Sequence, residues 1–204
     1  MTALFIVALL LPPPTDLGVP WTSYRSYEGG YEITLPKNFE YATATIPLGP
    51  PIRANVEVRL YLAVTELNGR EIVTAFVVSK QPQKVLNLLP PNKSLLEHGL
   101  DGLQSNPKIN VFQRKTVDHA SFGEGIAYRL SVVQANDQSS LYVVSFQRRE
   151  LTYEFKYSST DPDRPLTASE RKTIYKNFVA GSKYHGTDDF SSDAIEAMSS
   201  LFPF

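Results

Sequence analysis

The chain has 204 residues, of which 42% are hydrophobic and 20% charged, a composition typical of a globular domain of this size. Twenty Lys and Arg residues against 21 Asp and Glu give a net charge of -1. This balance argues against a nucleic-acid binder, because such proteins carry a basic excess. The absence of cysteine excludes disulfide frameworks, thiolate nucleophiles and cysteine-ligated metal sites.

Residues 1–18 are interpreted as a signal peptide or another apolar N-terminal segment. Residues 3–11 are an unbroken apolar run that ends at three consecutive prolines. The run is shorter than the roughly 20 residues that span a bilayer and has the length of a signal-peptide core. We therefore predict no transmembrane span, and export to the periplasm or the extracellular space. No Lys or Arg precedes the run and no A-x-A cleavage site follows it. A first strand, a tail buried against the domain, and a cytoplasmic location therefore stay open.

Strands are predicted through the first half of the domain. Residues 31–35 alternate between apolar and polar side chains, as a strand does, and residues 36–53, with four prolines, are predicted to form a loop. Residues 54–67 alternate again and are followed by Asn68-Gly69, a pair that favours a type I′ hairpin turn. The return strand, residues 72–78, is apolar on both faces, so we expect it nearer the centre of the sheet.

Two helices separated by a meander of strands are predicted for the second half. Leucines recur at helical spacing over residues 93–104. Four strands follow, over residues 109–118, 125–134, 141–147 and 151–157. Thr167 and Glu170 form the capping-box pattern that begins the last helix, and Gly181 is suited to end it. Residues 187–204 are acidic and weakly amphipathic and are interpreted as a C-terminal tail.

These elements predict one α+β domain over residues 19–186, built on an antiparallel sheet with a hairpin, a helix, a four-strand meander and a final helix. The segment from Glu28 to Pro36 is Glu-Gly-Gly-Tyr-Glu-Ile-Thr-Leu-Pro, and the last helix runs through Phe178-Val-Ala-Gly181. In these features and in element order the chain resembles the PsbP family, whose fold is shared with a small Ran-binding nuclear import factor. The resemblance implies an α/β/α sandwich, in a family with many exported bacterial domains of unassigned role. Because the strands over residues 54–67 and 151–157 have polar sides, we expect one sheet face to be partly open.

The sequence contains no recognisable catalytic or cofactor motif. It has neither H-E-x-x-H nor G-x-S-x-G, so we predict no cofactor, no metal site and a non-enzymatic role. One constellation keeps an alternative open: His98 and Asp101 on the predicted helix, with Asp118 and His119 after the next strand. If the two imidazoles converged, these groups would suit a small hydrolase or a metal-dependent enzyme.

A contact surface is predicted on the strand over residues 54–67. Burial of its apolar side, Val56 to Val64, turns the alternate side chains toward solvent. These candidate partner-contact residues are Asn55, Glu57, Arg59 and Tyr61. Glu154 and Lys156 on the last strand are expected to form cross-strand ion pairs with Glu57 and Arg59 on the same wet face.

Three functional hypotheses follow from these observations. The first is an exported, non-enzymatic binding or assembly module that contacts another protein through the exposed sheet face. The second is the small hydrolase or metal-dependent enzyme built on His98 and His119. The third is a structural protein of the cell envelope.

Overall fold

The computed structural model describes residues 21–26, 29–48, 52–90, 92–134 and 137–186, with the backbone alone for 132–134 and 137–139. The predicted N-terminal segment 1–18 and the C-terminal tail 187–204 lie outside the described residues. The first elements are β1 (Trp21–Ser26), β2 (Tyr31–Pro36), β3 (Glu40–Leu48), β4 (Ala54–Leu67), β5 (Arg70–Lys80), α2 (Gln83–Leu86) and α3 (Leu95–Gln104). They are followed by β6 (Ile109–His119), β7 (Gly123–Gln134), β8 (Asp137–Arg148), β9 (Leu151–Ser159), α4 (Ala168–Ile174), the π-helix η1 (Tyr175–Val179) and β10 (Lys183–Tyr184).

A seven-stranded sheet in the order β3-β4-β5-β9-β8-β7-β6 forms the centre of the molecule, and each neighbouring pair is antiparallel. The predicted α+β fold on an antiparallel sheet is confirmed. The hairpin is β4–β5, with positive φ at both Asn68 and Gly69, as a type I′ turn requires. The meander is β6 to β9, and β5 lies inside the sheet between β4 and β9.

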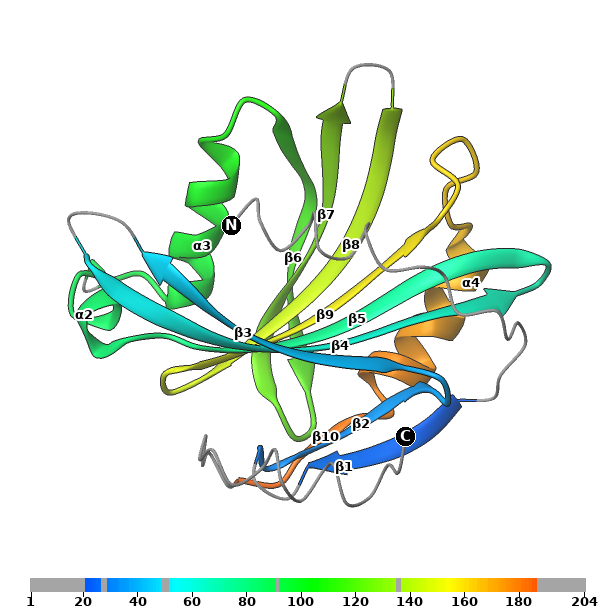
Figure 1. Cartoon of the computed structure of the whole chain (residues 1–204). Coiled ribbons are helices and arrows are strands. Elements are labelled where there is room, and N and C mark those ends of the chain that lie inside the picture. Colours follow the sequence, from blue (N-terminus) through cyan, green and yellow to red (C-terminus); the bar gives the residue numbers. More distant parts are fainter. Residues whose placement is uncertain (1–20, 27–28, 49–51, 91, 135–136, 187–204) are drawn as a thin grey trace.

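The two faces of this sheet are covered by different elements (Figure 1). Helix α3 packs on one face, where Leu100 joins Ile126, Leu130 and Val143 in a cluster over β7 and β8. On the other face lie α4, η1 and a three-stranded sheet in the order β1-β2-β10. The larger core is between these layers, with many aromatic rings. The resemblance implied helices on both faces, whereas here strands cover much of one face.

Both predicted helices begin at a capping box. Ser94 accepts a hydrogen bond from the Glu97 N–H at the start of α3, and Thr167 accepts one from the Glu170 N–H at the start of α4. The capping-box pattern at Thr167 correctly located the second helix start, whereas the first helix was predicted from the spacing of its leucines. Beyond Ile174 the last helix widens into η1, where the Ala180 N–H donates to the Tyr175 carbonyl. No helix in the described part of the chain is long and apolar enough to cross a membrane.

The predicted loop over residues 36–53 was wrong in its middle, because it contains the nine-residue strand β3. Four prolines suggested a loop, but Pro36 ends β2 and Pro47 lies near the end of β3. Pro47 is on an edge strand, which pairs with β4 on one side only among the described strands, and proline is tolerated there.

Candidate functional site

The structure divides the predicted contact residues on β4 into two exposed and two buried side chains. Asn55 and Glu57 are exposed, but Arg59 is only 6% exposed and Tyr61 is fully buried. The expectation that all four face solvent was wrong for Arg59 and Tyr61. The cause is the small sheet, because β2 crosses this face and the hydroxyls of Tyr31 and Tyr61 lie 2.7 Å apart.

Tyr61 is the centre of an aromatic cluster rather than a surface anchor. Its ring lies 4.8 Å from the Tyr41 ring, 5.5 Å from Tyr24 and 6.0 Å from Phe76. Burial raises the pKa of Tyr61 well above its usual value, and the neighbouring tyrosines act in the same direction. The Tyr61 hydroxyl is therefore a neutral hydrogen-bonding group of the core.

The polar sides of β4 and β9 lie on opposite faces of the sheet. Leu60 pairs with Val77, which pairs with Glu154, and paired residues share a face. Glu154 is therefore on the side of Leu60, away from Glu57. The expected cross-strand ion pairs do not form, and Lys156 instead contacts Glu154 on its own strand at 2.9 Å.

The two exposed members of the set line a shallow polar hollow of about 340 Å³. Its walls come from Asn55 and Glu57 on β4, Lys80 at the end of β5, the Gln81–Gln83 turn, and Glu150 at the β8–β9 turn. Glu57 and Lys80 are cross-strand neighbours. The hollow has the mixed charge predicted for the contact surface, without an aromatic residue.

The prediction of a catalytic or metal site at His98 and His119 is wrong, because the two imidazoles are on opposite sides of the large sheet. His98 is exposed on α3, whereas His119 is 8% exposed and packs against Phe122 and Phe146 of the other core. Asp101 pairs with Lys93 at 2.6 Å. No group of three or more His, Cys, Asp or Glu side chains suited to a metal ion occurs among the described residues.

His119 is a structural histidine. Its Nδ1 accepts hydrogen bonds from the N–H groups of Ser121 and Phe122, each at 3.2 Å, so the ring proton is on Nε2, which lies 3.1 Å from the Val179 carbonyl. Burial lowers the pKa of His119, against smaller opposing effects of Val179 and Asp118. A neutral imidazole thus joins the β6–β7 turn to the end of η1.

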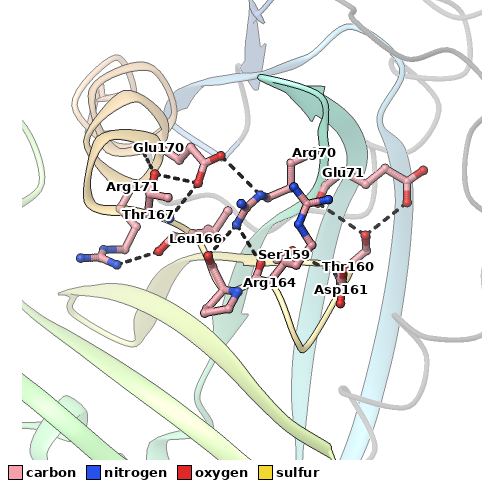
Figure 2. Close-up of polar contacts among 11 residues, drawn as sticks. Arg70, Glu71, Ser159, Thr160, Asp161, Arg164, Leu166, Thr167, Glu170 and Arg171 are labelled. Carbon is pink, nitrogen blue, oxygen red and sulfur yellow. Dashed lines mark hydrogen bonds and ion pairs between the residues drawn. The ribbon is translucent and has the colours of Figure 1, made fainter.

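A polar network joins the β4–β5 hairpin to the start of the last helix (Figure 2). Arg70 donates through Nη1 to the carbonyl oxygens of Arg164 and Pro165, at 2.8 and 2.6 Å. Its Nε lies 3.4 Å from Glu170 Oε1, an ion pair longer than a good hydrogen bond. Burial alone would raise the pKa of Glu170, but hydrogen bonds from Thr167 and the charge of Arg70 hold it below its usual value. The network stabilises a connection and presents no reactive group.

The two edges of the large sheet differ in a way that the sequence analysis missed. Strand β6 has a register shift between Phe112 and Lys115, a positive φ at Gln113 and the adjacent charges Arg114 and Lys115. Bulges and charges of this kind prevent a further strand from pairing. Strand β3 pairs with β4 without a shift, and its only charged residue is Glu40. Along the described part of the chain, β3 is the open edge.

No protein-family model matches the chain, and no curated protein matches it significantly. Among solved structures it is similar to cyanobacterial PsbP (CyanoP) from Synechocystis sp. PCC 6803, with a TM-score of 0.44 and 13% identity over 86% of this chain and 99% of that one. It is also similar to PA94 from Pseudomonas aeruginosa, a protein of unknown function, with a TM-score of 0.34 and 12% identity over 90% of this chain and 97% of that one. At these values neither likeness shows a shared family or function. The PsbP resemblance stays a prediction, and the fold class rests on the strand pairing described above.

Proposed function

We propose that the protein is a non-enzymatic binding or assembly module that acts after export and takes an extended segment of a partner protein along β3. The observation that carries this proposal is the open, almost uncharged edge of β3. Unpaired backbone N–H and C=O groups on a sheet edge can bind a further strand, which is a common mode of peptide recognition.

Side chains along β3 leave room for such a strand. Residues 42–45, Ala-Thr-Ala-Thr, are all exposed and small. Neither a charge nor a bulge interrupts pairing there, and the features that protect β6 are missing from the described β3. A partner strand would therefore gain main-chain hydrogen bonds along residues 42–45, before Pro47, which has no N–H to donate, without displacing any described element.

The remaining predicted contact residues lie next to the same edge. Asn55 pairs with Pro47 and Glu57 with Thr45, so the polar hollow borders the second half of β3. A partner that extends across this border would meet Glu57 and Lys80, and their charges would favour a segment with polar or oppositely charged side chains. Specificity is proposed to come from this hollow and affinity from the edge.

Photo-cross-linking in the native host tests the binding surface. A photoreactive amino acid at Thr43 should give a cross-linked species that the same substitution at Lys115, on the protected edge β6, does not give. Hydrogen exchange of the isolated complex should then show newly protected backbone amides on β3. Cross-linking at Lys115 alone, or a complex in which β3 amides exchange as in the free protein, would overturn the proposal.

Export is proposed from the apolar run over residues 3–11. The expected mature protein begins after Leu11, between Leu17 and Trp21. N-terminal sequencing of protein from the native host checks this expectation, and an intact Met1 or Thr2 in a cytoplasmic fraction would contradict it.

A further inference from the structure

A second surface, separate from the β3 edge, lies toward the other edge of the large sheet and carries two arginines. One row of paired residues crosses it, from Phe112 on β6 to Arg129 on β7 and Tyr142 on β8. Paired residues share a face, and Tyr142 belongs to the larger core, so the row is on the α4 side. Arg171 of α4 reaches the same row, because its Nη1 donates to the Tyr142 hydroxyl at 3.2 Å. We call Phe112, Arg129, Tyr142 and Arg171 the arginine surface.

Arg129 is held in place by an aromatic ring and not by an acid. Its guanidinium carbon lies 4.9 Å from the centre of the Phe112 ring, in a cation–π contact. Its Nε is buried and has no hydrogen-bond partner among the described residues, whereas its two Nη groups are not among the buried atoms. Because burial removes part of the hydration of this cation, the accessible Nη groups gain more from an anion than those of a fully hydrated arginine.

Arg171 is also held by neutral groups. Its Nη1 donates to the Leu166 carbonyl at 2.8 Å, and its guanidinium carbon lies 5.1 Å from the centre of the Tyr142 ring. Figure 2 shows its side chain pointing away from the Glu170 carboxylate, which pairs with Arg70 instead. Within the described part of the chain no carboxylate forms an ion pair with Arg171, so its charge is available to a ligand.

The acidic side chains described on β6, β7 and β9 are all on the other face of the sheet. Asp118 pairs with Glu124, which is two residues before Ile126 of the cluster under α3, and residues two apart on a strand share a face. Glu154 pairs with Ser145, which pairs with Ile126. All three acids are therefore on the α3 side. An anion that approaches the α4 side meets two cations, and these three carboxylates do not face it.

The residue types of the arginine surface favour a protein as its ligand. Phe112, at 36% exposure, is one of two large apolar side chains that are exposed in the described part of the chain. Arginine and aromatic residues are enriched where proteins bind one another, and a planar guanidinium matches a carboxylate in a two-point contact. The neutral Tyr142 ring stands between the two arginines, so they fit separate side-chain carboxylates better than the continuous charge of a nucleic-acid backbone. The net charge of -1 also disfavours nucleic acid.

We infer that the arginine surface binds an acidic segment of a second protein partner, whose Asp or Glu carboxylates contact Arg129 and Arg171 and whose chain covers Phe112. This contact is independent of strand addition at β3, because none of its residues is on β3, β4 or β5. Lys115 of β6 is on the same face, so the second partner would give a cross-linked species there that differs in mass from the one expected at Thr43. The failure of either proposal can therefore be recognised separately.

Fluorescence anisotropy of a labelled octa-glutamate peptide, mixed with the full chain at low ionic strength, tests the inference. Arg129→Gln and Arg171→Gln should each weaken binding about three- to tenfold, as expected for one charge-assisted contact at a partly exposed site. Arg129→Lys keeps the charge without the planar fork and should recover only part of the loss. The matched control, Arg114→Gln, removes the same charge from the α3 side of β6, where Arg114 pairs with Glu97 at 3.1 Å, and should change the affinity by less than about twofold.

Circular dichroism of each variant checks that the fold is kept, and each other result would overturn the inference. No binding of the peptide, or equal losses in all three Gln variants, would show that the arginine surface is not a specific site. Equally tight binding of an eight-nucleotide single-stranded DNA, lost in the same variants, would identify a phosphate site. Binding that appears only after the acids of residues 187–204 are replaced by amides would identify the chain's own segment as the occupant; these changes are Asp188→Asn, Asp189→Asn, Asp193→Asn and Glu196→Gln.

Discussion

Replacing Arg70 by alanine should remove the main connection between the β4–β5 hairpin and the last helix. Arg70 contacts the Arg164 and Pro165 carbonyls and the Glu170 carboxylate. The Arg70 and Glu170 side chains are 14% and 6% exposed, so in the variant water would solvate the Glu170 carboxylate poorly. The predicted loss is in the free energy of unfolding, without a change of fold.

Its magnitude can be assembled from the separate contacts. The two carbonyls accept from Arg70 in an exposed loop, where solvent replaces much of the interaction, so each contributes about 1 kcal/mol. Removal of one partner of a buried ion pair costs about 3–5 kcal/mol, but Glu170 keeps its hydrogen bonds from Thr167, at 2.7 and 2.8 Å, and the pair is not completely buried. We therefore expect Arg70→Ala to lower the free energy of unfolding by about 3 kcal/mol in total.

Urea denaturation measures this loss against a matched control. Arg164→Ala removes an exposed arginine in the same network but leaves intact its backbone carbonyl, which Arg70 contacts, so its effect should stay within about 0.5 kcal/mol. Glu170→Gln keeps the capping box and removes the charge, and a double-mutant cycle with Arg70→Ala then isolates the coupling between the two residues. Equal effects of Arg70→Ala and Arg164→Ala, or a coupling of zero, would refute the reasoning.

Three further predictions concern His119, Tyr61 and Gly69. Because burial lowers the pKa of His119, unfolded chains bind the extra proton first, so its contribution to stability is complete above about pH 6.5. That contribution should be lost as pH falls below this value, and urea titrations from pH 8 to 5 should show a shallower pH dependence for His119→Gln. Tyr61→Phe should cost about 1–2 kcal/mol, because it breaks the buried hydroxyl pair with Tyr31, and a cost near zero in the same assay would mean that Tyr61 is exposed. Gly69→Ala should cost about 1 kcal/mol, since φ there is +71° and the added Cβ meets only the Glu66 carboxylate oxygen, at 4.0 Å; an unchanged denaturation midpoint would contradict this.

Local signals in the sequence were sufficient for most of the secondary structure. The Asn68-Gly69 turn and the capping box at Thr167 act within a few residues, so their sequence patterns correspond directly to local geometry. Strand β3 was missed for two reasons. The prolines in and around it suggested a loop, and its Ala-Thr alternation gives little difference in polarity between the two faces of the strand. Because residues 42–45 of this edge strand are exposed, the sequence there has no apolar face to indicate a strand.

The position of Tyr61 could not be obtained from alternation. Alternation along β4 correctly separated Val56 and Leu60 from Glu57 and Tyr61, but it does not say what covers each face. The cover of Tyr61 is β2, which is about thirty residues away in sequence and packs by tertiary contact alone. Side chains on one face of this 14-residue strand are therefore exposed to solvent at one end of the strand and buried at the other end.

This change along β4 concentrates the candidate contact features in one corner of the sheet. The small sheet covers Arg59 and Tyr61, so the exposed polar part of that face is limited to Asn55 and Glu57. Those two residues pair with Pro47 and Thr45 on β3, where the open backbone edge is found. A partner that binds the edge would therefore meet the only predicted contact residues that stay exposed. Because the buried pair contributes to the core and the exposed pair does not, substitutions at Asn55 and Glu57 should affect binding separately from stability.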